Sequence, residues 1–184
     1  IYAKIADDEK RAFWLREMVK ADTTATKSTK TERTQFLAAG ASFDLAERRQ
    51  KEFEKIRLIH PLPRSLQAKK SAMQDAVKLY GQAAVYGHAE FVTGSTLAIG
   101  EIYRHFSVSL LESERPGDLN ADELEQYNIL LEDQAFPFED KAIEFYETNV
   151  GRIAQGVYDP AIKASLQHLR DLFPARYGRA GKVE

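Results

Sequence analysis

The sequence predicts an all-α fold. Apolar residues recur at spacings of three and four along almost the whole chain, which is the period of a helix face. No stretch shows the convincing period of two that a half-buried strand requires. Proline-containing breaks divide the periodic segments into separate helices. The 184 residues, 43% of them apolar, suffice for a single domain, 1–184, with a sizeable core.

The first helix is predicted over residues 7–20, with Phe13, Trp14, Met18 and Val19 as its apolar side. The stretch that follows, residues 21–34, is rich in threonine and lacks large apolar side chains over most of its length. It reads as a linker, either a loop or the frayed start of the next helix.

Three long helices follow, over residues 32–57, 65–86 and 89–114. The first of these ends before His60-Pro61-Leu62-Pro63, because proline cannot donate its amide and biases the preceding residue away from helical geometry. Gly87 is a plausible C-terminal cap for the second helix. Arg115-Pro116-Gly117 ends the third.

The fifth helix begins at Asn120, which forms a capping box with Glu123 three residues later. Its apolar phase continues unbroken across Pro137, which favours one long kinked helix over two helices that meet there. Gly156 ends it. A short last helix begins at Asp159-Pro160 and ends at Phe173-Pro174, and the remainder reads as a basic tail.

Composition excludes several function classes. The net charge of −2 provides no field that would attract nucleic acid. With no cysteine, the chain has no disulfide, no thiolate metal site and no cysteine nucleophile. No apolar run approaches the roughly 18–20 residues that span a bilayer, so we expect no direct membrane insertion. Because the chain starts at Ile1 and its first residues already have a helical pattern, we expect it to be the C-terminal piece of a longer protein.

A dense group of carboxylates in the fifth helix is the most conspicuous chemical feature. It contains five residues that we call the acidic ridge: Glu132, Glu139, Asp140, Glu144 and Glu147. A bundle metal site would need Glu-x-x-His motifs, and none of the four histidines has a glutamate three residues before it. We therefore predict no metal and no cofactor. The ridge is interpreted as an outward face that could dock a basic partner, with Glu144 weakly paired to Lys141.

Other polar constellations are interpreted structurally. Glu101 and His105 are four residues apart on one helix and read as a surface or rim pair. The short basic run of Arg64, Lys69 and Lys70 reads as a solvated face, because it lacks interleaved aromatic residues. Three glycines inside helices are predicted to allow close approach of neighbouring helices: Gly81, Gly94 and Gly100.

A small-aromatic-small spacing occurs twice, 37 residues apart: Ala39, Phe43, Ala46 and Ala76, Tyr80, Ala83. This spacing resembles the second helix of a tetratricopeptide repeat, in which small residues let helices close up. Ile99, Gly100 and Tyr103 resemble the first helix of that repeat, and residues 107–116 resemble the end of its second helix. The interval from Gly100 to Pro116 leaves no room for a turn, so these two helices should be fused into one.

Over a longer range, residues 55–177 look like the C-terminal region of large proteobacterial tetratricopeptide-repeat proteins. Those proteins are associated with envelope systems of the gliding-motility and Tol-like kind. The most specific segments are SERP, EDQAFPFEDKAIE and PARY. The resemblance implies a tetratricopeptide-like helical repeat or irregular α-solenoid with C-terminal capping helices. It also implies a periplasmic or envelope-associated location, although a cytoplasmic one stays open.

Three functional readings follow. The first is a non-enzymatic scaffold that binds protein partners, possibly components of an envelope complex. The second is a helical-bundle enzyme or small-ligand-binding domain, with a pocket lined by Tyr80, Tyr86, Tyr103 and His105. The third is a purely structural C-terminal cap, because solenoids need modified terminal units.

Overall fold

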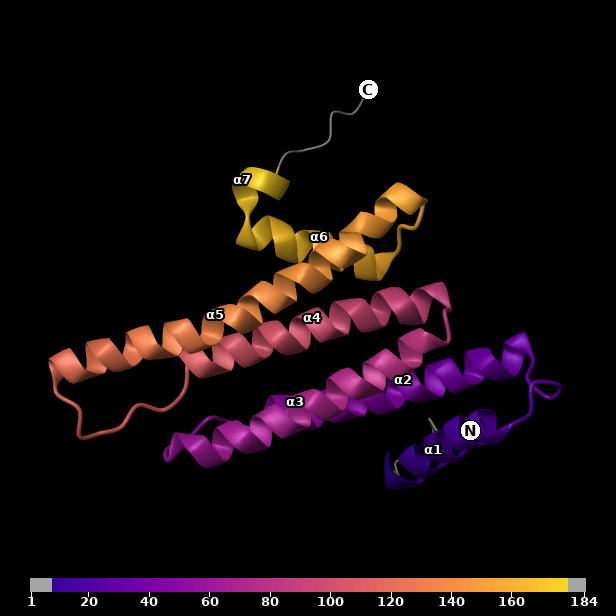
Figure 1. The fold of residues 1–184 in the computed structure, drawn as a ribbon, viewed down its shortest axis with the longest axis horizontal. Helices are drawn as coiled ribbons and strands as arrows, with labels where there is room; N and C mark the ends of the chain where they lie inside the picture. The colour runs from indigo at the N-terminus through magenta and orange to yellow at the C-terminus, as the bar shows by residue number, and fades with distance from the viewer. Residues whose placement is uncertain (1–7, 179–184) are drawn as a thin grey trace.

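The computed structural model describes residues 8–178. Within that range the chain is helical, without strands, and climbs from α1 at one side to α6 and α7 at the other (Figure 1). The helices are α1 (Asp8–Thr24), α2 (Glu32–Lys55), α3 (Leu62–Val85), α4 (Ala89–Leu111), α5 (Ala121–Gly151), the 3-10 helix η2 (Arg152–Gln155), α6 (Pro160–Leu172) and α7 (Pro174–Tyr177). No helix of the described part has the length and hydropathy needed to cross a membrane.

Local capping fixes most of the helix ends. Asn120 and Glu123 form the predicted capping box at the start of α5, and Asp159 caps α6 by accepting from the Ile162 amide. Gly87 and Gly156 both have positive φ, of 78° and 81°, where a helix stops and a side chain would be strained. These signals lie within a few residues of one another in the chain, so they could be predicted from the sequence.

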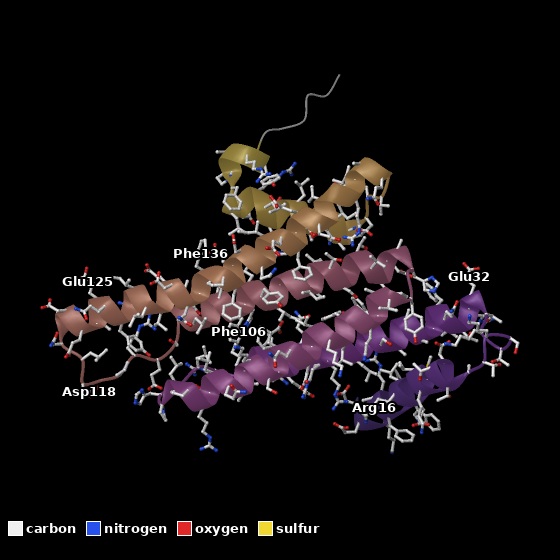
Figure 2. All side chains as sticks on the ribbon, viewed as in Figure 1. Arg16, Glu32, Phe106, Asp118, Glu125 and Phe136 are labelled. Carbon is white, nitrogen blue, oxygen red and sulfur yellow. The ribbon has the colours of Figure 1, made fainter. Side chains whose placement is uncertain are left out.

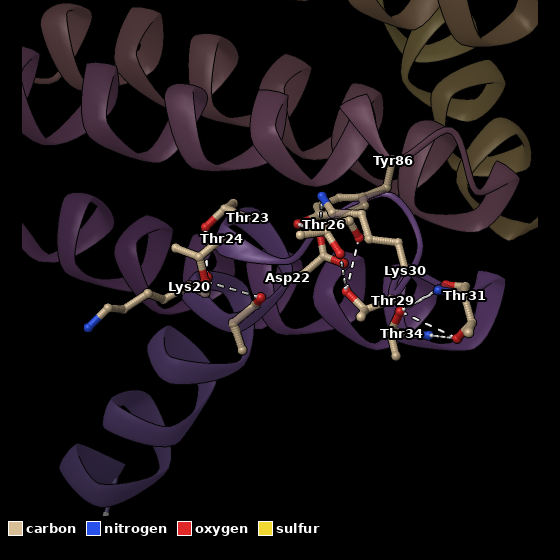
Figure 3. Close-up of polar contacts among 11 residues, drawn as sticks. Lys20, Asp22, Thr23, Thr24, Thr26, Thr29, Lys30, Thr31, Thr34 and Tyr86 are labelled. Carbon is tan, nitrogen blue, oxygen red and sulfur yellow. Dashed lines mark hydrogen bonds and ion pairs between the residues drawn. The ribbon is translucent and has the colours of Figure 1, made fainter.

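The stretch predicted as a linker is narrower than residues 21–34. The first helix continues through Thr24, and only residues 25–31 separate it from α2. The hydroxyl groups of Thr23 and Thr24 each donate a hydrogen bond of 2.9 Å to the Lys20 carbonyl (Figure 3). These bonds satisfy a carbonyl in the last turns of the helix. Thr31 then caps α2 through its hydrogen bonds with Thr34.

The aromatic residues on the apolar side predicted for α1 are half exposed, whereas Met18 of the same side lines a cleft against α2 and Val19 is partly buried. Phe13, Trp14 and Met18 are 50%, 46% and 40% exposed, and the buried hydrophobic residue of α1 is Ala12. Three ion pairs join this helix to α2. Arg11 forms an ion pair with Asp44, and Arg48 of α2 forms ion pairs with Asp8 and Glu9. Ion pairs thus contribute to the attachment of the N-terminal helix, and Phe13 and Trp14 are half exposed.

The fifth helix is one continuous element with Pro137 inside it, as predicted. Its buried residues Leu131, Ala135 and Ala142 follow the predicted apolar phase. Beyond Gly151 the backbone tightens into η2, where we had expected the same helix to reach Gly156. The chain after Phe173 is also not a plain tail, because Pro174–Tyr177 forms a helical turn.

The fourth helix is likewise continuous, as expected from the missing turn, and glycines let its neighbours approach. A Cβ at Gly100 would lie 2.6 Å from the Tyr146 ring of α5, and one at Gly94 would lie 3.1 Å from the Phe43 ring of α2. Gly81 does not have this role, because nothing lies within 4 Å of its Cβ position. The prediction was correct for two of the three glycines.

The main core lies between α2, α3, α4 and α5. Phe106 is buried there, with its ring 4.4 Å from that of Phe138 (Figure 2). The alanines of both small-aromatic-small segments are buried, and the aromatic members Phe43 and Tyr80 pack edge to face at 5.3 Å. Each helix packs on its chain neighbours. In addition, α2 contacts α4 and α4 contacts α6.

A buried hydrogen-bond network joins α4, α5 and α6 at the C-terminal end. Asn149 is 0% exposed, and its Nδ2 donates to the Thr93 carbonyl and to Ser165 Oγ, both at 3.0 Å. Thr93 Oγ1 in turn donates to Asp159 at 2.6 Å. This network and the apolar contacts of Tyr146 and Leu169 fix α6 across the long helices.

Candidate functional site

An open groove with a volume of about 980 Å³ lies between α2 and α4, and Lys69 of α3 contributes to its lining. A smaller cavity of about 270 Å³ extends it toward Phe43 and Gly94. The two cavities share Gln50, Glu54 and Glu101, so they form one surface feature, which we call the α2/α4 groove.

Helical spacing places the wall residues of this groove. Gln50 and Glu54 lie four residues apart on α2 and therefore share one face, and Arg57 follows just after the helix ends at Lys55. Glu101 and His105, with Val108 and Glu112 after them, form the corresponding stripe on α4. One further wall residue comes from α6: His168, whose Nε2 lies 3.4 Å from Glu101 Oε1. Three alternate helices of the chain therefore border the same groove.

A hydrogen-bonded chain of side chains lines the middle of the groove. The Tyr80 hydroxyl donates to Gln50 Oε1 at 2.7 Å, and Gln50 Nε2 donates to Glu54 Oε1 at 2.9 Å. Burial raises the pKa of Tyr80 well above its ordinary value, so the hydroxyl remains a donor at physiological pH. The chain fixes the orientation of the Gln50 and Glu54 side chains before any ligand arrives.

Lys69 lies beneath the groove and is 0% exposed, which corrects its interpretation as part of a solvated basic face. Its Nζ donates to the carbonyls of Ile56 and Phe53 at 2.8 and 3.3 Å, at the C-terminal end of α2. The same ammonium lies 4.4 Å from the centre of the Phe53 ring. Lys69 thus caps a helix with a buried charge, and burial lowers its pKa to about 8.

The Lys69→Met variant is expected to lose a pH dependence of stability that the parent protein shows. Below about pH 8 both the folded and the unfolded chain hold the Lys69 proton, so the folded state bears the full cost of the buried charge. The unfolded lysine titrates near 10.5, and the folded one loses its proton first. Between about pH 7 and pH 10 the free energy of unfolding of the parent should therefore rise by about 2 kcal/mol relative to that of the variant.

Urea unfolding of both proteins across that range measures this gap. Subtracting the variant removes the contributions of other titrating groups, including the tyrosines. If the free energies of unfolding of the two proteins changed with pH in parallel, the assignment of a depressed pKa to Lys69 would be contradicted.

His105 lines the groove, but its ring is already engaged by neighbouring residues of the chain. Burial lowers its pKa, which favours the neutral ring at physiological pH. Its Nδ1 lies 3.2 Å from Ser109 Oγ, and its ring packs edge to face on Phe53 at 5.1 Å. The predicted rim pair of Glu101 and His105 is not formed as such, because Glu101 approaches His168 of α6 instead.

The predicted tyrosine pocket is not assembled in one place. Tyr80 and His105 both border the α2/α4 groove. Tyr86 instead donates to Asp22 of α1, and Tyr103 stacks on Phe145 between α4 and α5. Among residues 8–178, no three His, Asp or Glu side chains lie close enough to hold a metal ion.

The acidic ridge lies on α5, with Glu132, Asp140 and Glu144 exposed. Glu144 Oε2 accepts from Lys141 at 2.6 Å, which confirms the predicted pair. Glu139 is half-buried, and Glu147 is engaged within the chain. The Tyr177 hydroxyl donates to Glu147 at 2.6 Å, and Arg176 pairs with it at 3.1 Å. The turn α7 therefore covers one end of the ridge.

Sequence reasoning missed Lys69 and the groove as a whole. A signal for Lys69 was present, because it falls in the apolar phase of α3 between Leu66 and Met73, at the three- and four-residue spacing of a buried face. The groove itself depends on how far apart α2 and α4 lie, which no local pattern encodes. No family model, curated protein or solved structure matches this chain.

Proposed function

We propose that this domain is a non-enzymatic docking scaffold that holds a segment of a partner protein in the α2/α4 groove. The observation that carries the proposal is the groove itself, an open channel bordered by charged side chains of both signs. The stretch of α2 that borders it, from Phe43 to Glu54, rises about 16 Å, enough for about five residues of extended chain.

Unpaired charges on the groove walls support a polypeptide ligand. Arg57 and Arg104 are exposed and make no hydrogen bond or ion pair with the other residues of the 8–178 range. Glu54 of α2 and Glu112, which directly follows α4, supply carboxylates to the same groove. Such walls are complementary to a ligand that carries charges of both signs. Charge complementarity of this kind increases specificity and association rate more than affinity.

The helix arrangement supports an irregular helical repeat as the architecture. Alternate helices α2, α4 and α6 contact one another in sequence and contribute to one groove. Solenoids of helical hairpins present extended concave surfaces in this way. On the resemblance alone, we propose the periplasm or cell envelope as the location and envelope proteins as partners. The acidic ridge is a second docking surface in this proposal.

Site-specific photo-crosslinking in a proteobacterial envelope extract tests the groove. A photoreactive phenylalanine analogue replaces Val108, a groove residue that is 40% exposed, or Val85, which is 86% exposed and borders neither groove cavity. We expect a discrete protein adduct from the Val108 position alone. Adding Arg104→Glu should reduce its yield severalfold, because reversal of a rim charge slows association.

Equal labelling from both positions would contradict specific binding in the groove. An adduct only from a probe at Glu132 would move the site to the acidic ridge. The absence of an adduct at all positions would favour the structural-cap reading. Far-UV circular dichroism of each probe-bearing protein controls for the fold.

A further inference from the structure

A second surface lies at the other end of the molecule, between α1 and the start of α2. It is a cleft of about 260 Å³, which we call the α1/α2 cleft. Its apolar lining consists of Met18, Ala21, Ala25, Leu37 and Ala38. Pockets that take small molecules measure about 300–1,000 Å³, so this cleft suits one large side chain of a partner better.

The segment that closes one end of the cleft is basic. Residues 25–33 carry three cations, Lys27, Lys30 and Arg33, against one carboxylate, Glu32. Lys30 is tied to the buried Asp22 at 3.4 Å, and Tyr86 donates to the same carboxylate oxygen (Figure 3). Lys27 and Arg33 are exposed and have no ion-pair partner in the described part of the chain. The cleft therefore suits an apolar side chain carried on an acidic segment.

The outer face of α5 has that chemistry. Phe136 is 64% exposed on this face (Figure 2), and Ile129 lies two helical turns before it on the same side. Residues 132–147 contain six carboxylates and one lysine. Glu132 and Asp140 lie one turn to either side of Phe136. A large exposed apolar residue surrounded by carboxylates is the complement of an apolar cleft beside unpaired cations.

We propose that the α1/α2 cleft of one molecule binds α5 of a second copy of this chain. Phe136 enters the cleft, and the carboxylates around it face Lys27 and Arg33. This names the basic partner of the acidic ridge and so rests on the docking role proposed for the ridge, but it is separate from binding in the α2/α4 groove. The two surfaces differ, so the contact is head to tail and leaves one free surface at each end of the assembly.

Sedimentation velocity over a concentration series at low salt tests this proposal. The parent protein should show a mass that rises with concentration beyond a dimer, and added salt should suppress the rise. Phe136→Ser and Leu37→Ser should each weaken association about tenfold or more, because each removes apolar area from the contact.

The decisive sample is a mixture of these two variants. The Phe136→Ser protein keeps an intact cleft and the Leu37→Ser protein keeps an intact α5 face, so an equimolar mixture should form a dimer that does not grow. A parent protein that stays monomeric at every concentration would overturn the proposal, and so would a mixture that stays monomeric while the parent associates.

Charge reversal provides a second test that leaves the apolar residues intact. Reversing Glu132 and Asp140 to lysine, or Lys27 and Arg33 to glutamate, should abolish association, and all four changes in one chain should restore it. Failure of the fourfold variant to associate while its urea unfolding matches the parent would overturn the charge pairing. Arg104→Glu is the control and should associate normally, so a failure here and a failure of groove binding can be told apart.

Discussion

Gly100→Ala is expected to lower the free energy of unfolding by about 2–3 kcal/mol, even though alanine is the better helix former. The new Cβ would lie 2.6 Å from one carbon of the Tyr146 ring and 2.9 Å from another. Tyr146 is fully buried, so its ring can move only by shifting α5 away from α4. The overlap therefore outweighs the gain in helix propensity.

Urea unfolding of Gly100→Ala beside Gly81→Ala measures this effect with a matched control. Both glycines lie inside long helices, but nothing surrounds the Cβ position of Gly81, so that variant should gain about 0.5–1 kcal/mol. Tyr146→Phe should not rescue Gly100→Ala, because the close atoms are ring carbons and not the hydroxyl. Equal stabilities for the two glycine variants would show that α4 and α5 are not in the contact described here.

Asn149→Ala is expected to lower the free energy of unfolding by about 2–4 kcal/mol. The substitution removes both donors that bind Thr93 and Ser165 and opens a void at a fully buried position. It also removes the oxygen that accepts from Arg152 at 2.7 Å. Because these bonds join three helices, the loss should fall most heavily on the docking of α6.

Thermal or urea unfolding gives the size of this loss, and amide hydrogen exchange gives its location. Thr148→Ala is the control, since the Thr148 hydroxyl is exposed and bonds only to its own helix, at Glu144. That variant should lie within about 0.5 kcal/mol of the parent. A similarly small change for Asn149→Ala, or loss of exchange protection spread evenly over all helices, would contradict the role assigned to the network.

The features that were predicted correctly from the sequence are local. The capping box at Asn120, the cap at Asp159 and the passage of α5 through Pro137 all depend on residues within one or two turns. The apolar phase of α5 was predictable because its helix packs by a single, strongly periodic face. Local signals of this kind determine where a helix begins and where it ends.

What the sequence did not reveal depends on contacts between distant segments. The helical pattern of α1 predicts that its aromatic side is buried, whereas the distant Asp44 and Arg48 form ion pairs with other residues of the helix. Glu147 was counted as a free ridge residue, although Tyr177, thirty residues later, donates to it. The groove needs the spacing of three helices. The residues of the groove are distant from one another in the sequence, and only the folded structure brings them together.

The charged attachment of α1 implies that the two ends of the molecule are governed by different solvent variables. Ion pairs between half-exposed side chains weaken as ionic strength rises, whereas the buried amide network at Asn149 and the apolar contacts around Leu169 do not. We therefore expect α1 to open locally at a lower free energy than the whole domain, and added salt should lower that free energy further. At raised ionic strength, amide hydrogen exchange should therefore speed up in α1 before it does in α6.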